Sequence, residues 1–207
     1  MDDSFLARPK KEIFDFCEMY EKHFKLPFWF NTRIENCRPE YLKALKAAGV
    51  HRMQFGMESG NEQYRKKVLQ RDIPNKTYLE YFDYINASDI AYVLNLIIGM
   101  PGETRELVFD TIRLAKAARG YDGLTISTFI PYHGTVLRDI CVRNGWLDPN
   151  YMSCATHGLQ EDSVLKMPKP YLQKEEIIRL KNTINLYCFF DEKDWPEIKL
   201  AEFDEEK

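Results

Sequence analysis

The segment 91–118 constrains the fold of this chain more than any other part of the sequence. It begins with an apolar run bounded by turn residues, as in a parallel strand buried on both faces, although a short buried helix has the same pattern. Pro101 and Gly102 predict a tight turn, because proline presets φ at the first corner and glycine accepts a positive φ at the second. Thr104 can cap the helix that follows, and Gly120 can end it. The segment therefore predicts a strand, a turn and a helix N-terminus.

Hydrophobic periodicity predicts a similar alternation over the rest of residues 9–144. Thr77 and Glu80 form a capping-box pair, which predicts a helix that begins beside Thr77. This alternation predicts crossover connections and a parallel sheet, either a barrel or an open doubly wound sheet. The other predicted strands cover residues 28–34, 50–57 and 124–130, and the other predicted helices cover residues 9–24, 39–48, 62–69 and 137–142.

Composition excludes several classes of protein. A net charge of -3 gives no electrostatic reason to expect binding to nucleic acid or to an anionic membrane. No apolar run approaches the roughly 20 residues that span a bilayer, and the N-terminus lacks the apolar core of a signal peptide. The five cysteines form no C-x-x-C pair and no disulfide framework, as is typical of thiols in a reducing compartment. We therefore expect a cytoplasmic protein without a metal site of its own.

Each predicted strand ends in polar or special residues, whereas the strand starts show no such pattern. Ligands of parallel α/β proteins are held by the loops after the strands, so this asymmetry predicts a binding site there. The alternative is that loops are simply polar and that these residues cap helices. The residues concerned are Asn31, Thr32, Arg33, Glu58, Ser59, Asn61, Gly102, Glu103, Tyr132 and His133.

Each of these side chains also has an ordinary interpretation. Glu58 and Ser59 could bind ribose hydroxyls or an ammonium group, but Ser59 could equally cap a helix. His133 could act as a general acid or base, or it could be a solvated loop residue. The three arginines Arg33, Arg65 and Arg71 could hold a carboxylate, or could have no such role. The residues alone therefore predict a ligand-binding α/β domain and no particular reaction.

Four segments resemble, in their order and spacing, the later strands of radical S-adenosylmethionine enzymes, and in particular the branch that often carries a cobalamin-binding domain. They are residues 1–5, 55–62, 96–104 and 129–135. The resemblance implies a partial parallel (β/α) barrel over residues 1–145 that lacks its first strands. We expect residues 146–207 to form an irregular and mainly helical extension, with a helix over residues 173–190 and frayed charged residues at the C-terminus.

The resemblance also implies a chemistry. Members of this family hold a 4Fe-4S cluster on a C-x-x-x-C-x-x-C loop, and the cluster cleaves S-adenosylmethionine to a 5'-deoxyadenosyl radical that abstracts a substrate hydrogen. This chain has no such motif. We therefore expect it to be the core and C-terminal part of a longer enzyme, whose missing N-terminal segment supplies the cluster ligands and whose cobalamin, if used, binds an absent domain.

A second hypothesis is a cluster-free remnant that binds a ligand or a partner without catalysis. An unrelated barrel enzyme with a phosphate site is disfavoured, because the sequence has no glycine-rich phosphate loop. The substrate is not predicted, and methyl transfer, ring formation and oxidative cyclisation all remain open.

Individual residues take roles from the resemblance. Asp2, Asp3 and Phe5 would lie near the methionine amino group, and Glu58 and Ser59 would contact the ribose or the methionine moiety.

The remaining assignments follow in the same way. Arg65 or Arg71 would hold the carboxylate of the cofactor, and Arg33 and His133 are weaker expectations for substrate contacts. The residues expected around the adenine are Ile98, Gly99 and Glu103, together with the backbone of Ile130, Pro131 and Tyr132.

Overall fold

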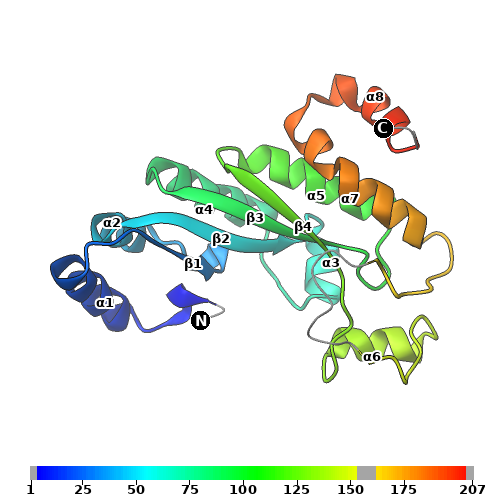
Figure 1. Cartoon of the computed structure of the whole chain (residues 1–207), viewed down its shortest axis with the longest axis horizontal. Helices are drawn as coiled ribbons and strands as arrows, with labels where there is room; N and C mark the ends of the chain where they lie inside the picture. The colour runs from blue at the N-terminus through cyan, green and yellow to red at the C-terminus, as the bar shows by residue number, and fades with distance from the viewer. Residues whose placement is uncertain (1–3, 153–161, 204–207) are drawn as a thin grey trace. The chain divides into compact units, whose positions relative to one another are not determined.

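The structure, a computed structural model, describes residues 4–152 and 162–203 and contains a four-stranded parallel sheet (Figure 1). Its strands lie in the order β1-β2-β3-β4, which is their order in the sequence. A doubly wound sheet reverses its strand order part of the way across, so the sequential order identifies the sheet as part of a barrel. The strands are β1 (Phe28–Thr32), β2 (Val50–Glu58), β3 (Ala91–Ile98) and β4 (Gly123–Thr128).

Helices follow each strand and confirm the predicted alternation. Three short 3-10 helices, at residues 5–7, 34–36 and 192–194, accompany the α-helices among the described residues. The α-helices are α1 (Lys10–His23), α2 (Pro39–Ala48), α3 (Glu62–Lys67), α4 (Asn75–Ala87), α5 (Arg105–Ala118), α6 (Val136–Arg143), α7 (Lys174–Phe189) and α8 (Trp195–Ala201).

Two local predictions were wrong or incomplete. The capping box at Thr77 does not form, because α4 already begins at Asn75. The carbonyl of Pro74 accepts the backbone N–H of Thr77 at 3.0 Å, so Thr77 lies inside the first turn. The short helix α8 was not predicted, although Pro196 in its first turn is a typical helix-start residue. The expected boundary at residue 145 between barrel and extension stays a prediction.

The chain divides into two compact units. The first unit contains residues 1–57, 73–95 and 117–125, and the second contains residues 58–72, 96–116 and 126–207.

In the first unit, β1 pairs with β2 in parallel, with Phe30 opposite Met53. Aromatic side chains cover one face of β1: the ring of Phe30 lies 4.9 Å from that of Phe5, which lies 5.1 Å from that of Phe16 on α1. Aromatic pairs at such distances contribute attraction beyond the burial of their area. This cluster attaches α1 and the N-terminal residues to β1.

The core of the second unit lies around the loop that follows β3. Met100 in this loop is 1% exposed and packs in a cluster with Tyr64 of α3 and with Phe129 just after β4. Leu165 and Met167, which lie between α6 and α7 in the sequence, are also buried in this cluster. The core therefore combines the strand ends with residues far along the chain.

Gly60, between β2 and α3, lies directly against α5. A Cβ atom at this position would lie 2.2 Å from the carbonyl oxygen of Asp110 and 2.5 Å from the Cα of Thr111. The N–H of Gly60 donates to Oγ1 of Thr111 at 2.8 Å. Position 60 therefore requires glycine, because its backbone lies too close to the backbone of α5 to leave room for a side chain.

We expect Gly60→Ala to lower the free energy of unfolding by about 3 kcal/mol or more, since the added methyl group meets backbone atoms that cannot move independently. Gly123→Ala is the matched control, because its Cβ would lie 3.5 Å from the nearest side-chain atom of Val93. That variant should change the stability by less than about 1 kcal/mol. Urea unfolding followed by circular dichroism measures both, and equal midpoints would contradict the close packing of Gly60.

Candidate active site

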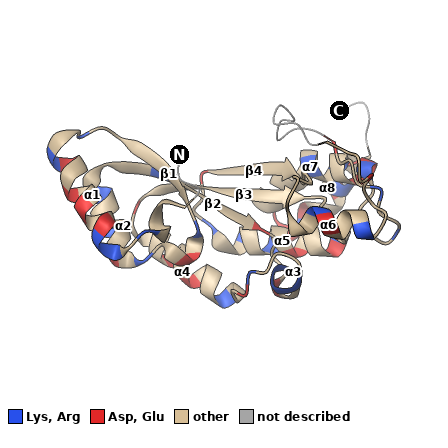
Figure 2. Cartoon of the chain, turned by 90° about the horizontal axis from the view of Figure 1, so that it is seen from below, with Lys and Arg blue, Asp and Glu red and all other residues tan. Residues whose placement is uncertain are grey.

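Glu58 is the last residue of β2 and has an unusual backbone conformation. Its φ is 62°, in the left-handed region that residues other than glycine rarely adopt. Only β2 among the four strands carries charged residues, namely Arg52 and Glu58 (Figure 2). Backbone strain and a carboxylate at a strand end are both typical of functional positions.

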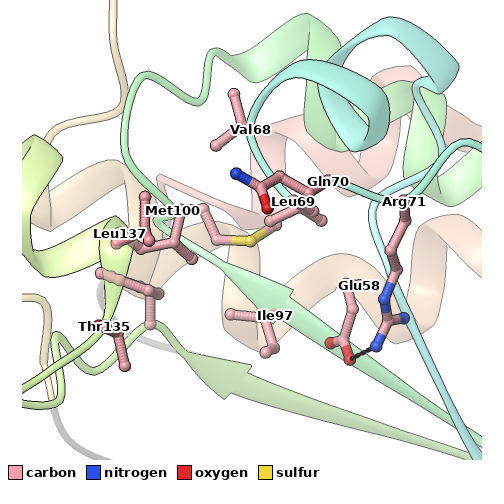
Figure 3. A pocket seen from close by; sticks show the side chains of 11 residues that line it. Glu58, Val68, Leu69, Gln70, Arg71, Ile97, Met100, Thr135 and Leu137 are labelled. Atoms are coloured by element: carbon pink, nitrogen blue, oxygen red, sulfur yellow. Dashed lines mark ion pairs between the residues drawn. The ribbon is translucent and has the colours of Figure 1, made fainter.

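The Glu58 side chain lines a cavity of about 300 Å³ in the second unit (Figure 3). A volume of this size is at the lower end of the range for small-molecule sites. Arg71, which follows α3, is on the same side of the cavity as Glu58, and their charged ends point toward each other. The other lining residues are mostly apolar: Val68, Leu69, Gln70, Ile97, Met100, Phe129, Thr135, Val136 and Leu137.

The two charges in this cavity lie near each other without a direct hydrogen bond between them. Nη2 of Arg71 is 3.8 Å from Oε1 of Glu58, and the two side chains are 23% and 19% exposed. Burial raises the pKa of Glu58 above its ordinary value, and the charge of Arg71 opposes this rise in part. The site thus presents a carboxyl group and a guanidinium beside apolar walls, which suits a ligand that has both charged and apolar parts.

Glu103 fixes the turn after β3. Its Oε2 accepts the backbone N–H of Gly99 at 2.6 Å and that of Met100 at 3.3 Å. Burial raises the pKa of Glu103 to about 8, although these two hydrogen bonds lower it in part. Because both bonds end on Oε2, Oε1 can carry the proton of the neutral acid. Gly102 has a φ of 75°, which confirms the predicted turn.

Ser59 and Arg65 are fully buried behind the strand end. Nη1 of Arg65 donates to the backbone oxygen of Ser59 at 2.8 Å, and Oγ of Ser59 accepts the N–H of Asn61 at 3.4 Å. Asn61 caps α3, since its side chain accepts the N–H of Tyr64 at 2.9 Å. These contacts give Ser59 and Arg65 a structural role, and their contact with a cofactor stays a prediction.

The residues expected at the adenine belong to the second unit. Ile98 is buried, and its carbonyl accepts the N–H of Phe129 at 2.9 Å, which joins the ends of β3 and β4. Beyond Phe129, Ile130 is half-buried, Pro131 is buried and Tyr132 is 49% exposed. None of the three lines the cavity, so their expected backbone contacts stay predictions.

The remaining predicted residues lie elsewhere. In the first unit, Phe5 packs in the aromatic cluster on β1, and Arg33 is exposed beside Glu35 at 3.7 Å. His133 is exposed in the second unit. Asp2 and Asp3 lie outside the described residues.

Sequence reasoning missed most of the cavity wall. Gln70, Thr135 and Leu137 line the cavity, yet none of them follows a strand directly. Two features of the sequence could have pointed to these residues. One is the break after α3, beside Gln70, and the other is the helix cap of α6, where Oγ1 of Thr135 accepts the N–H of Arg138 at 3.3 Å.

The described residues show neither a cluster of metal ligands nor a membrane-spanning helix. Among them, no group of three His, Cys, Asp or Glu side chains is placed to hold a metal ion. The four described cysteines are buried, at Cys17, Cys37, Cys141 and Cys188. Within residues 4–152 and 162–203, no helix has the length and apolar character needed to cross a bilayer.

Comparison with known proteins gives consistent matches. The profile of the Radical SAM superfamily matches residues 8–115. An uncharacterized methyltransferase of Pyrococcus horikoshii, PH0819, is 27% identical over 148 residues, which cover 71% of this chain and 32% of that protein.

Two solved structures share the fold. Coproporphyrinogen III oxidase (HemN) from Escherichia coli, a radical SAM enzyme, has a TM-score of 0.60 at 16% identity and covers 88% of this chain. The radical S-adenosylmethionine methyltransferase TsrM from Kitasatospora setae, solved with cobalamin and a [4Fe-4S] cluster, has a TM-score of 0.53 at 14% identity and covers 63% of this chain. This chain spans only 38% and 28% of these two proteins.

We expect Glu103→Gln to remove a pH dependence of stability. Burial raises the pKa of Glu103 in the folded protein from the ordinary 4.5 to about 8. The contribution of this group to the free energy of unfolding is therefore fully present below pH 4.5 and is lost as the pH rises from 4.5 to 8. The wild-type unfolding free energy should fall relative to the variant by up to about 1.4 kcal/mol per pH unit in this window. Glutamine keeps the oxygen that accepts both N–H groups.

Urea unfolding at pH 5, 6, 7, 8 and 9 measures this difference. Glu106→Gln, an exposed position in the first turn of α5, is the control and should follow the wild type. Parallel pH curves for the wild type and Glu103→Gln would show that Glu103 is ionised in the folded protein throughout.

Proposed function

Since this chain belongs to the radical SAM superfamily, we propose that the cavity beside Glu58 and Arg71 binds S-adenosylmethionine, as part of a longer radical enzyme. The observation that carries this proposal is the pairing of a carboxyl and a guanidinium group in an otherwise mostly apolar cavity at the end of β2.

The residues present fit the chemical groups of S-adenosylmethionine. Its methionine end carries a carboxylate and an ammonium group, and Arg71 and Glu58 offer a charge of opposite sign to each. A guanidinium binds a carboxylate through paired hydrogen bonds, while the carboxyl group of Glu58 can accept from an ammonium or from ribose hydroxyls. Apolar side chains such as Ile97 and Phe129 suit the uncharged parts of the ligand.

When bound at a reduced cluster, the cofactor supplies a 5'-deoxyadenosyl radical. The sequence contains no C-x-x-x-C-x-x-C motif, and the described residues provide no ligand set for a 4Fe-4S cluster. We propose that the ligands come from a segment of the same protein beyond these 207 residues, since this chain spans 32% of its methyltransferase relative. The part of the chain that the structure describes would bind and orient the cofactor.

For the reaction of the whole protein we propose cobalamin-assisted methyl transfer on an unknown substrate. Two relatives support this choice, because the Pyrococcus protein is named as a methyltransferase and TsrM is a methyltransferase with bound cobalamin. The cobalamin would bind a further domain. The alternative remains a cluster-free module that binds a ligand or partner without catalysis, and the missing cluster motif favours it for the chain as printed.

The binding proposal is tested by calorimetric titration of the chain with S-adenosylmethionine and with its decarboxylated analogue. A charge-assisted hydrogen bond contributes about 1.5–3 kcal/mol, so Arg71→Met should weaken binding of S-adenosylmethionine about 10- to 100-fold. The variant should bind both ligands equally, because the carboxylate has lost its partner. Lys66→Met is the control, since Lys66 forms an ion pair with Asp72 in which both side chains are more than half exposed.

Two results would contradict the proposal. If Arg71→Met still prefers S-adenosylmethionine by the wild-type ratio, Arg71 does not hold the carboxylate. If the folded wild-type chain binds neither ligand, the cavity does not bind the cofactor in this chain, and the cluster-free module becomes the better description.

A further inference from the structure

Gln70 has a left-handed backbone conformation just after α3, with a φ of 54°. The N–H of the next residue, Arg71, donates to the carbonyl of Arg65 at 2.9 Å, so the chain turns back onto the end of the helix here. Helices commonly end in such a turn, and its left-handed residue is usually glycine, because a Cβ atom makes this conformation unfavourable. The backbone at position 70 therefore favours glycine, and the glutamine side chain is present at the expense of stability.

The Gln70 side chain lines the same cavity as Glu58 and Arg71. In Figure 3 its amide group points away from the contact between the charged ends of those two residues. Its neighbours in the cavity wall, Val68 and Leu69, are apolar. Gln70 thus places a neutral polar group in the part of the cavity that is otherwise apolar.

The amide of Gln70 has no hydrogen-bond partner in the part of the chain that the structure describes. Thr135, the other neutral polar side chain that lines the cavity, is already bonded twice: its Oγ1 accepts the N–H of Arg138 at 3.3 Å and donates to the carbonyl of Tyr132 at 2.8 Å. A glutamine amide has two N–H donors and one oxygen acceptor. Gln70 therefore has donor and acceptor groups available to a ligand.

We propose that Gln70 is a ligand-binding residue that hydrogen-bonds the nucleoside end of S-adenosylmethionine. This inference rests on the proposed function. With the carboxylate and the ammonium group held by Arg71 and Glu58, the remaining hydrogen-bonding groups of the ligand are the ribose hydroxyls and the adenine nitrogens. These groups are uncharged, and a neutral amide can donate to them or accept from them without a charge in the apolar part of the cavity.

The binding part of the test uses Gln70→Ala in the full chain, because alanine removes the amide and keeps a Cβ atom. Calorimetry measures the affinity for S-adenosylmethionine and for 5'-methylthioadenosine, which has the nucleoside but neither the carboxylate nor the ammonium group. Loss of a neutral hydrogen bond should weaken binding of both ligands about 3- to 10-fold. Arg71→Met should weaken binding of S-adenosylmethionine alone.

The second part of the test measures urea unfolding of Gln70→Gly. Glycine adopts a positive φ without a steric penalty, so the equilibrium constant for unfolding should fall about fivefold, while both ligands bind as weakly as to Gln70→Ala. Lys25→Gly is the matched control, because Lys25 is an exposed residue after α1 with a φ of 51° and does not line the cavity. It should gain stability in the same way and keep the wild-type affinities.

A residue with only a structural role, or one that only contacts water, would not combine a gain in stability with a loss of binding. Unchanged affinity of Gln70→Ala for both ligands would overturn the role of Gln70, while a selective loss in Arg71→Met would still support the proposed function. A Gln70→Gly variant less stable than the wild type would overturn the inference that position 70 is strained.

The comparison of the two ligands separates the remaining outcomes. If Gln70→Ala weakens binding of S-adenosylmethionine alone, Gln70 does not contact the nucleoside end. A wild-type chain that binds S-adenosylmethionine but not 5'-methylthioadenosine would also contradict the inference, because the nucleoside would then make no contact of its own. A wild-type chain that binds neither ligand would overturn the proposed function and the role of Gln70 together.

Discussion

The buried carboxyl group of Glu103 is the contact on which the second unit depends. It accepts two backbone N–H groups of the turn after β3, and its own carbonyl accepts the N–H of Leu172 at 2.9 Å. The hydroxyl of Tyr64 donates to the carbonyl of Pro101 in the same turn at 2.8 Å. Three segments that are distant in the sequence therefore meet at one turn, and the cavity wall formed by Met100 is fixed by them.

The cavity combines two requirements that oppose each other. Apolar walls exclude water and favour the neutral form of Glu58, while Arg71 favours its charged form. A ligand that carries a carboxylate and an ammonium group would offer each of these two side chains a partner of opposite charge. The charge of Arg71 therefore offsets part of the cost of placing the Glu58 carboxylate among apolar side chains.

Much of the fold was predictable because it is written in local patterns. Apolar runs and helix-start residues place the four strands and most helices within a few residues, and Gly102 adopts the positive φ that the predicted turn requires. The site was only partly predictable. Glu58 and Arg71 were identified as candidates, but their proximity and the contributions of Gln70 and Thr135 depend on how separate segments pack.

The sequence by itself determined the alternation of strands and helices, the turn after β3 and the family to which the chain belongs. These properties follow from periodicity, from glycine and proline geometry, and from motifs in a fixed order. The tertiary structure decided the sequential strand order, the burial that raises the pKa of Glu103, and the contacts by which the buried Arg138 joins Pro131 to Pro149 and Tyr151. Such properties depend on burial and on carbonyl groups, which every residue carries and which no sequence pattern distinguishes.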